Sequence, residues 1–98
     1  MKWLAPILIS GCLSAEQFDT DWIEAHCTLL SECEVLDLYG HSALDECLTD
    51  TPPLAEDCED FDKEVAQDCL DRTEAMGCEA VLNNHTPTAC KEVCGEEQ

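Results

Sequence analysis

Residues 18–36, FDTDWIEAHCTLLSECEVL, decide the fold of this chain. Apolar side chains recur there at steps of three and four, a spacing that places them on one face of an α-helix. The stripe consists of Phe18, Trp22, Ala25, Leu29, Cys33 and Leu36, widened by Ile23, Cys27 and Leu30. We expect a helix of about five turns that begins at Phe18-Asp19, where Asp19 caps the free amides and Phe18 packs on Ile23. Gly40 is its C-terminal stop.

Two further helices are predicted downstream. Ser42 is a helix cap with Asp45 three residues later, and Thr51-Pro52-Pro53 ends this short helix. Phe61-Asp62 repeats the first start, and the apolar residues behind it share one helical face until Gly77 ends the helix.

The last segment predicts a turn followed by a short helix. Asn83-Asn84-His85 forms the turn, and Thr86-Pro87 opens a helix that carries Cys90 and Cys94. No stretch alternates with a period of two, so we expect no sheet. The sequence therefore predicts an all-α, disulfide-stapled domain of about four helices.

The cysteine content is far above ordinary usage, with nine cysteines in 98 residues. Such a chain is typical of an exported domain held together by disulfides. Eight of the nine lie in the predicted helical domain, and a closed framework requires an even number: Cys27, Cys33, Cys47, Cys58, Cys69, Cys78, Cys90 and Cys94. The hydrophobic core of a domain this small gives it only marginal stability, and four disulfides would supply the stability that the core lacks.

The pairing is only partly restricted by spacing, because eight cysteines allow about a hundred connectivities. Cys27 and Cys33 point to different faces of one helix, so they do not bridge each other. Cys90 and Cys94 share a face but are too far apart along the helix axis. Bonds Cys33–Cys47 and Cys78–Cys90 would each close a helix–turn–helix corner, and we expect those two.

Charge excludes several classes of partner. The chain has 23 acidic and 4 basic residues, a formal net charge of −19. Phosphate backbones repel such a protein, which excludes nucleic-acid binding, and there is no basic face for anionic lipid.

The N-terminus has the order of an export signal. Lys2 precedes an apolar run from Trp3 to Ile9, and Ile9-Ser10-Gly11-Cys12 resembles the lipobox of bacterial lipoproteins. The resemblance implies cleavage before Cys12 and acylation of that cysteine, with palmitate among the fatty acids, so that the mature protein is held on a membrane. Leu13, rather than an aspartate, follows Cys12 and favours the outer membrane, with the periplasmic or surface leaflet left open.

The alternative is an ordinary secretory signal in which Cys12 stays unmodified. Cysteine parity favours lipidation, because it leaves an even number of thiols for disulfides. We accordingly divide the chain into a lipoprotein signal peptide at 1–11, a lipidated tether at 12–17, a helical domain at 18–94 and a tail at 95–98.

Motifs for metal binding or catalysis are scarce. There is no Cys-x-x-Cys, and the nearest metal constellation is His85 with Cys90 and Cys94, whose thiols would oxidise after export before they bind metal. The acidic run at 56–64 fails the spacing of an EF-hand loop, although weak calcium attraction stays open. No catalytic signature occurs. We expect no enzyme activity, cofactor, catalytic residue or metal ligand, with His26 and His41 at surface or boundary positions.

The mature part resembles the small, acidic, cysteine-rich helical lipoproteins of some Gram-negative bacteria. The shared features are the Phe-Asp helix starts, the scattered single cysteines and the closing Ala89-Cys90-x-x-x-Cys94. The resemblance implies no defined activity.

We expect a non-enzymatic, lipid-anchored envelope protein that serves as a binding or structural module. The alternative is a freely secreted disulfide-rich effector or inhibitor peptide. We expect any protein partner to bind an apolar groove on the helical core. The candidate contact is the corner Leu38-Tyr39-Gly40-His41, because Tyr39 is the aromatic side chain expected at the surface.

Overall fold

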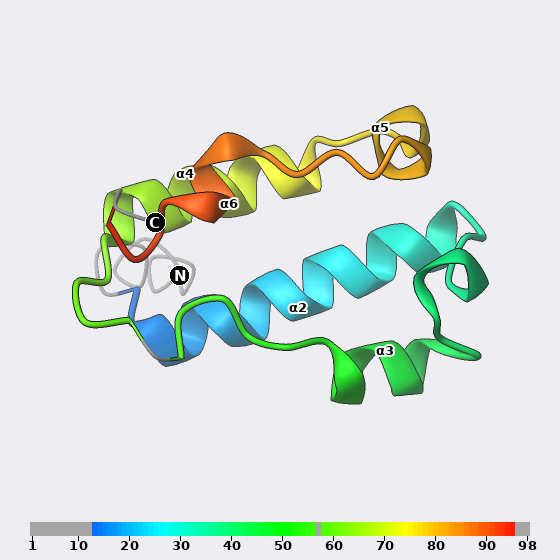
Figure 1. Cartoon of the computed structure of the whole chain (residues 1–98), viewed down its shortest axis with the longest axis horizontal. Coiled ribbons are helices and arrows are strands. Elements are labelled where there is room, and N and C mark those ends of the chain that lie inside the picture. The colour runs from blue at the N-terminus through cyan, green and yellow to red at the C-terminus, as the bar shows by residue number, and fades with distance from the viewer. Residues whose placement is uncertain (1–12, 57, 96–98) are drawn as a thin grey trace, which may run out of the picture.

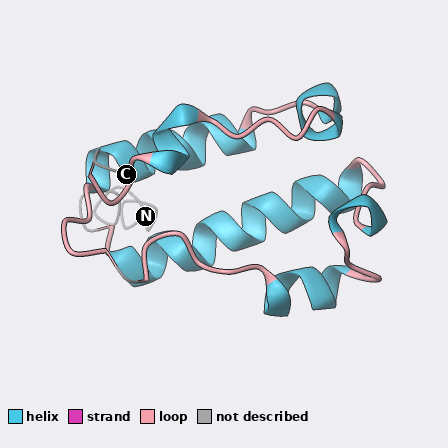
Figure 2. Cartoon of the chain, in the orientation of Figure 1, coloured by secondary structure: helices cyan, strands magenta, loops and turns pink. Residues whose placement is uncertain are grey.

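The computed structural model describes residues 13–56 and 58–95. Within them the chain forms helices and loops, with an isolated bridge at Val93 and Gly95 but no β-strand (Figure 2). The elements are α2 (Ala15–Glu32), the 3-10 turn η1 (Asp37–Tyr39), α3 (Leu44–Asp50), α4 (Lys63–Glu74), α5 (Cys78–Leu82) and α6 (Thr88–Lys91). The all-α, disulfide-stapled fold is confirmed, and α5 is the additional helix. The predictions for residues 1–12, including Cys12, and for 96–98 lie outside the described residues.

Helix α2 is the axis of the described fold. It packs against α3 on one side and α4 on the other, while α6 packs on α4 and α5 lies beside the C-terminal end of α2 (Figure 1). Two apolar clusters follow from this arrangement. One joins the first half of α2 to α4 and α6, where the ring centroids of Phe18 and Phe61 are 5.9 Å apart. The other joins the second half of α2 to η1, α3 and α5 around Leu30 and Val81. None of the described helices has the length and apolar content to cross a bilayer.

The first helix begins and ends earlier than predicted. Its N-cap is Ser14, whose hydroxyl accepts the Gln17 amide at 3.1 Å, so the predicted cap at Asp19 is wrong and residues 15–17 of the predicted tether are helical. The helix ends at Glu32, well before the predicted stop at Gly40, because Glu34 takes the left-handed conformation with φ 60°. The Glu34 amide then donates to Ser31 and the Val35 amide to Leu30, an arrangement that closes the helix as a Schellman motif.

The later helix starts match the predictions in part. Asp62 caps α4 as expected, since its carboxylate accepts the amides of Glu64 and Val65. Helix α3 ends at Asp50, with Thr51 as its C-cap, before the two prolines, also as expected. Its N-cap, however, is Ala43 and not Ser42.

Three boundary predictions for the C-terminal part need correction. Gly77 is the N-cap of α5, whereas α4 already ends at Glu74. Pro87 is the N-cap of α6 and not its first residue. Helix α6 ends at Lys91, so Cys94 lies beyond it, because a single helical turn is all that the segment forms.

All eight cysteines of the described domain form disulfides with one another. The bonds are Cys27–Cys47, Cys33–Cys78, Cys58–Cys94 and Cys69–Cys90. The predicted bonds Cys33–Cys47 and Cys78–Cys90 are therefore wrong. The physical reason is helix α5, which places Cys78 beside the end of α2, so that Cys33 bonds there and Cys27, two turns earlier, bonds to α3. The expected absence of bonds within the 27/33 and 90/94 pairs is confirmed.

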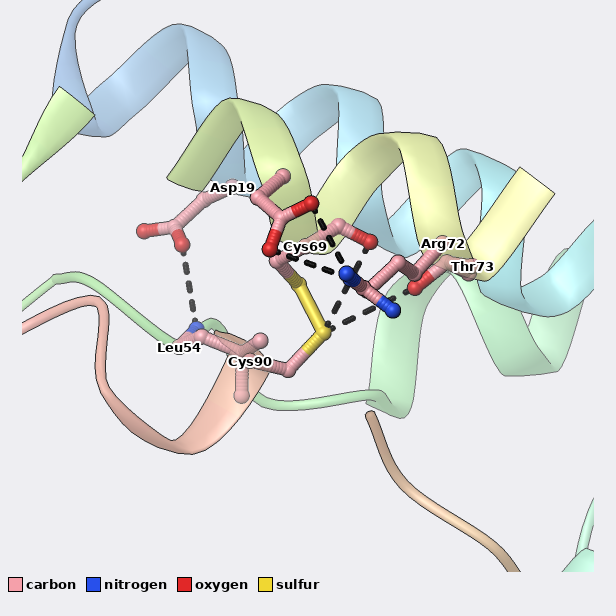
Figure 3. The surroundings of a disulfide bond; sticks show 7 residues. Asp19, Leu54, Cys69, Arg72, Thr73 and Cys90 are labelled. Atoms are coloured by element: carbon pink, nitrogen blue, oxygen red, sulfur yellow. Dashed lines mark hydrogen bonds and ion pairs between the residues drawn. A yellow bond between two sulfur atoms is a disulfide. The ribbon is translucent and has the colours of Figure 1, made fainter. Parts of the chain in front are cut away.

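A buried carboxylate fixes the long loop between α3 and α4. Asp19 is 8% exposed, and its Oδ1 accepts a hydrogen bond from the backbone amide of Leu54 at 3.0 Å (Figure 3). The same oxygen accepts a second hydrogen bond, from the backbone amide of Ala55 at 2.8 Å. In the same region the Cys69–Cys90 disulfide joins α4 to α6 (Figure 3). The loop is thereby held against the start of α2, where its buried Ala55 completes the first apolar cluster.

Candidate functional site

An open groove runs between α2 and α4. Its volume is about 610 Å³. The helix α2 side is lined by Gln17, Asp21, Glu24, Ala25, Thr28, Leu29 and Glu32, the α4 side by Gln67, Leu70, Thr73 and Glu74, and one end by Leu13. The α2 residues at positions 21, 24, 28 and 32 share one face of the helix, next to its apolar stripe. They line the groove.

The groove combines an apolar floor with an acidic rim. Leu70 is nearly buried at its floor, and the partly buried Ala25 and Leu29 extend the apolar surface. Four carboxylates, those of Asp21, Glu24, Glu32 and Glu74, line the rim, and no basic side chain does. Such a surface is complementary to a ligand that carries positive charge beside an apolar face.

The structure does not bring Tyr39 to this groove. The Tyr39 side chain is half-buried, and its hydroxyl donates to the Val81 carbonyl at 2.8 Å. Its ring meets His26 edge-on with the centroids 5.9 Å apart. The neighbouring Leu38 is the exposed residue of this corner, with 69% of its surface accessible.

Three potential metal ligands meet along one side of α3. Ligand atoms of His41, Glu46 and Asp50 all lie within 4.8 Å of one another. Glu46 and Asp50 are four residues apart and therefore share a face of α3. The amide of His41 donates to the Leu36 carbonyl at 3.0 Å, which holds His41 beside that face.

The electrostatics of this cluster are set by close neighbours. The backbone amide and hydroxyl of Ser42 both donate to Oε1 of Glu46 and lower the pKa of its carboxyl below the ordinary value. Burial lowers the pKa of His26, and the nearby charge of His41 lowers it further. The Nδ1 atom of His41 is buried and has no hydrogen-bond partner in the described structure.

The metal constellation considered from sequence does not form. Cys90 and Cys94 are both in disulfides, which leaves their sulfurs without the thiolate charge that binds metal, and His85 is exposed.

Neither the groove carboxylates nor Glu46 and Asp50 were predicted from the sequence as site residues. Two sequence patterns could have indicated these sites. Acidic residues recur at steps of three and four along α2, and Glu46 and Asp50 are four residues apart on α3.

Comparison of the chain with protein-family models, with curated proteins and with solved structures gave no match.

Proposed function

We propose that this protein is a non-enzymatic, lipid-anchored module of the cell envelope that binds a cationic segment with an apolar face. The observation that carries the proposal is the closure of eight cysteines into four disulfides within residues 27–94. Four disulfides require an oxidising compartment. They also complete the framework without Cys12, which is then available as the acylated residue.

The anchor would lie close to the folded domain. Helix α2 begins at Ala15, so only residues 13 and 14 separate it from Cys12, a span of about 7–10 Å when extended. The start of α2 would then face the membrane. The other end of this 18-residue helix lies about 27 Å farther along its axis.

The groove supplies the binding surface. Its four carboxylates and apolar floor are suited to an amphipathic helix or peptide with lysine or arginine on one side and large apolar residues on the other. Acidic partners are excluded by the same charges. The net charge of −19 adds long-range attraction for a cationic partner.

The anchor is tested by replacing Cys12 with serine in the full chain and expressing both forms in a Gram-negative host. The wild-type protein should partition into the detergent phase, and Cys12→Ser should move to the aqueous phase with its four disulfides unchanged. Equal detergent partitioning of the two proteins would contradict lipidation. Release of the wild-type protein into the medium would instead support the freely secreted alternative.

The groove is tested with a synthetic amphipathic helix of leucine and lysine as the probe. The variant Glu24→Gln/Glu32→Gln/Glu74→Gln should bind this peptide about tenfold or more weakly at about 0.15 M salt, where long-range charge is screened. The matched control Glu34→Gln/Glu59→Gln/Glu92→Gln removes the same charge from exposed positions outside the groove. Equal weakening by both triple variants, or equal binding of a leucine–glutamate peptide, would contradict a specific groove.

A further inference from the structure

We infer that His41, Glu46 and Asp50 form a binding site for a first-row divalent transition metal, with Zn²⁺ as the representative ion. The site is separate from the α2–α4 groove, because none of its three residues lines that groove.

The geometry requires only small movements. The ligand atoms are within 4.8 Å of one another, and two ligands of a tetrahedral Zn²⁺ at about 2.0–2.1 Å are about 3.3 Å apart. Rotation of the Glu46 and Asp50 side chains on one face of α3 can close that difference. The backbone beneath them is rigid, because Cys47 in the same helix is bonded to Cys27 of α2.

The buried nitrogen of His41 is the second observation. An imidazole nitrogen that is buried without a partner costs free energy, and native structures rarely leave one unpaired. The Nδ1 of His41 is in that situation in the described structure. Glu46 and Asp50 lie five and nine residues downstream, and each has a carboxylate oxygen within 4.8 Å of a nitrogen of this imidazole.

Glu46 is oriented in advance for ligation. The amide and hydroxyl of Ser42 both donate to its Oε1, the hydroxyl at 2.8 Å, so neither of them engages Oε2. Metal-binding carboxylates are commonly held in this way by outer hydrogen bonds.

The donor set selects the class of metal. One imidazole and two carboxylates suit Zn²⁺ and its neighbours in the first transition row, whereas Ca²⁺ takes six or more oxygen ligands. The disulfides remove every cysteine of the described domain from competition. Three protein ligands leave at least one position for water or for a group from a partner.

The experiment is calorimetric titration of the disulfide-intact protein with Zn²⁺ at pH 7 and about 0.15 M salt, a concentration that screens exposed charge. Wild type should bind one Zn²⁺ per chain above any weak background. His41→Gln and Glu46→Gln should each abolish that site, and Ser42→Ala should weaken it by about tenfold while keeping the stoichiometry. Because His41 and Glu46 are partly buried, each variant is also checked for an unchanged melting temperature without metal.

Two controls separate the site from general acidity. Asp45→Asn removes a carboxylate from the first turn of α3 outside the cluster, and His85→Gln removes an exposed imidazole elsewhere. Both should bind Zn²⁺ as the wild type does. Retention of the site in His41→Gln, equal loss in Asp45→Asn, or no stoichiometric site in the wild type would each overturn the proposal.

Discussion

The hydroxyl of Tyr39 donates a hydrogen bond to the carbonyl of Val81 at 2.8 Å. The bond joins η1, in the first half of the chain, to α5 in the second half. Together with the Cys33–Cys78 disulfide it holds α5 against the end of α2. The aromatic side chain that the sequence analysis expected at the surface is thus part of the packing of the second apolar cluster.

Removing this hydroxyl should destabilise the fold. Tyr39→Phe removes this bond and leaves the Val81 carbonyl with the Asn84 amide alone, at 2.9 Å, which should cost about 1 kcal/mol. For a domain of this size that lowers the melting temperature by about 4–8 °C. Leu38→Ser, at the exposed neighbour, is the control and should leave the melting temperature unchanged. Equal melting of Tyr39→Phe and wild type would show that the bond is not formed in solution.

The two Phe-Asp motifs should respond differently to loss of the carboxylate. Asp19→Ala leaves the amides of Leu54 and Ala55 without an acceptor inside the fold and should cost about 2–3 kcal/mol. Asp62→Ala removes an exposed helix cap and should cost about 1 kcal/mol. Chemical denaturation of both, with the exposed Glu24→Ala as the charge control, measures the difference. A larger loss for Asp62→Ala would contradict the assigned roles.

The left-handed residue that ends α2 is a site for stabilisation. Glu34 has φ 60°, a conformation that costs a residue with a side chain about 1 kcal/mol relative to glycine. Glu34→Gly should therefore raise the melting temperature. Glu34→Gln removes the same negative charge and keeps the strain, so it isolates the effect of charge. If Glu34→Gln stabilises the protein as much as Glu34→Gly, self-repulsion and not backbone strain is responsible.

The sequence predicts the long helices of this fold but not the short segments that end or connect them. Apolar periodicity located α2 and α4, because Phe18, Cys69 and their neighbours do face the core. It missed the end of α2, since a glutamate rather than a glycine occupies the left-handed position at Glu34. It also missed α5, whose five residues are too few to show a period.

The pairing of the cysteines and the two candidate sites depend on those missed features. Cys33 meets Cys78 only because α5 exists, so no argument from loop closure alone could find that bond. The groove requires the relative placement of α2 and α4. The cluster of His41 with Glu46 requires the turn through Gly40, whose left-handed φ of 87° brings His41 back to α3.

The disulfide connectivity can be checked without a structure. Acidic residues separate all eight cysteines of the domain from one another along the sequence, so an Asp- and Glu-specific protease should place each on its own peptide. Mass spectrometry of the unreduced digest should find four linked pairs, corresponding to 27–47, 33–78, 58–94 and 69–90. Recovery of a 33–47 or 78–90 pair would contradict the fold at the α2–α5 contact.

The most direct test of the central claim is the intact mass of the protein purified from the membranes of a Gram-negative host. We predict a chain that starts at Cys12, carries diacylglycerol and an amide-linked fatty acid on that residue, and is two hydrogens lighter for each of four disulfides. A mass without acyl groups, or one that gains iodoacetamide adducts at the eight domain cysteines without reduction, would contradict the account of a lipid-anchored, fully disulfide-bonded envelope protein.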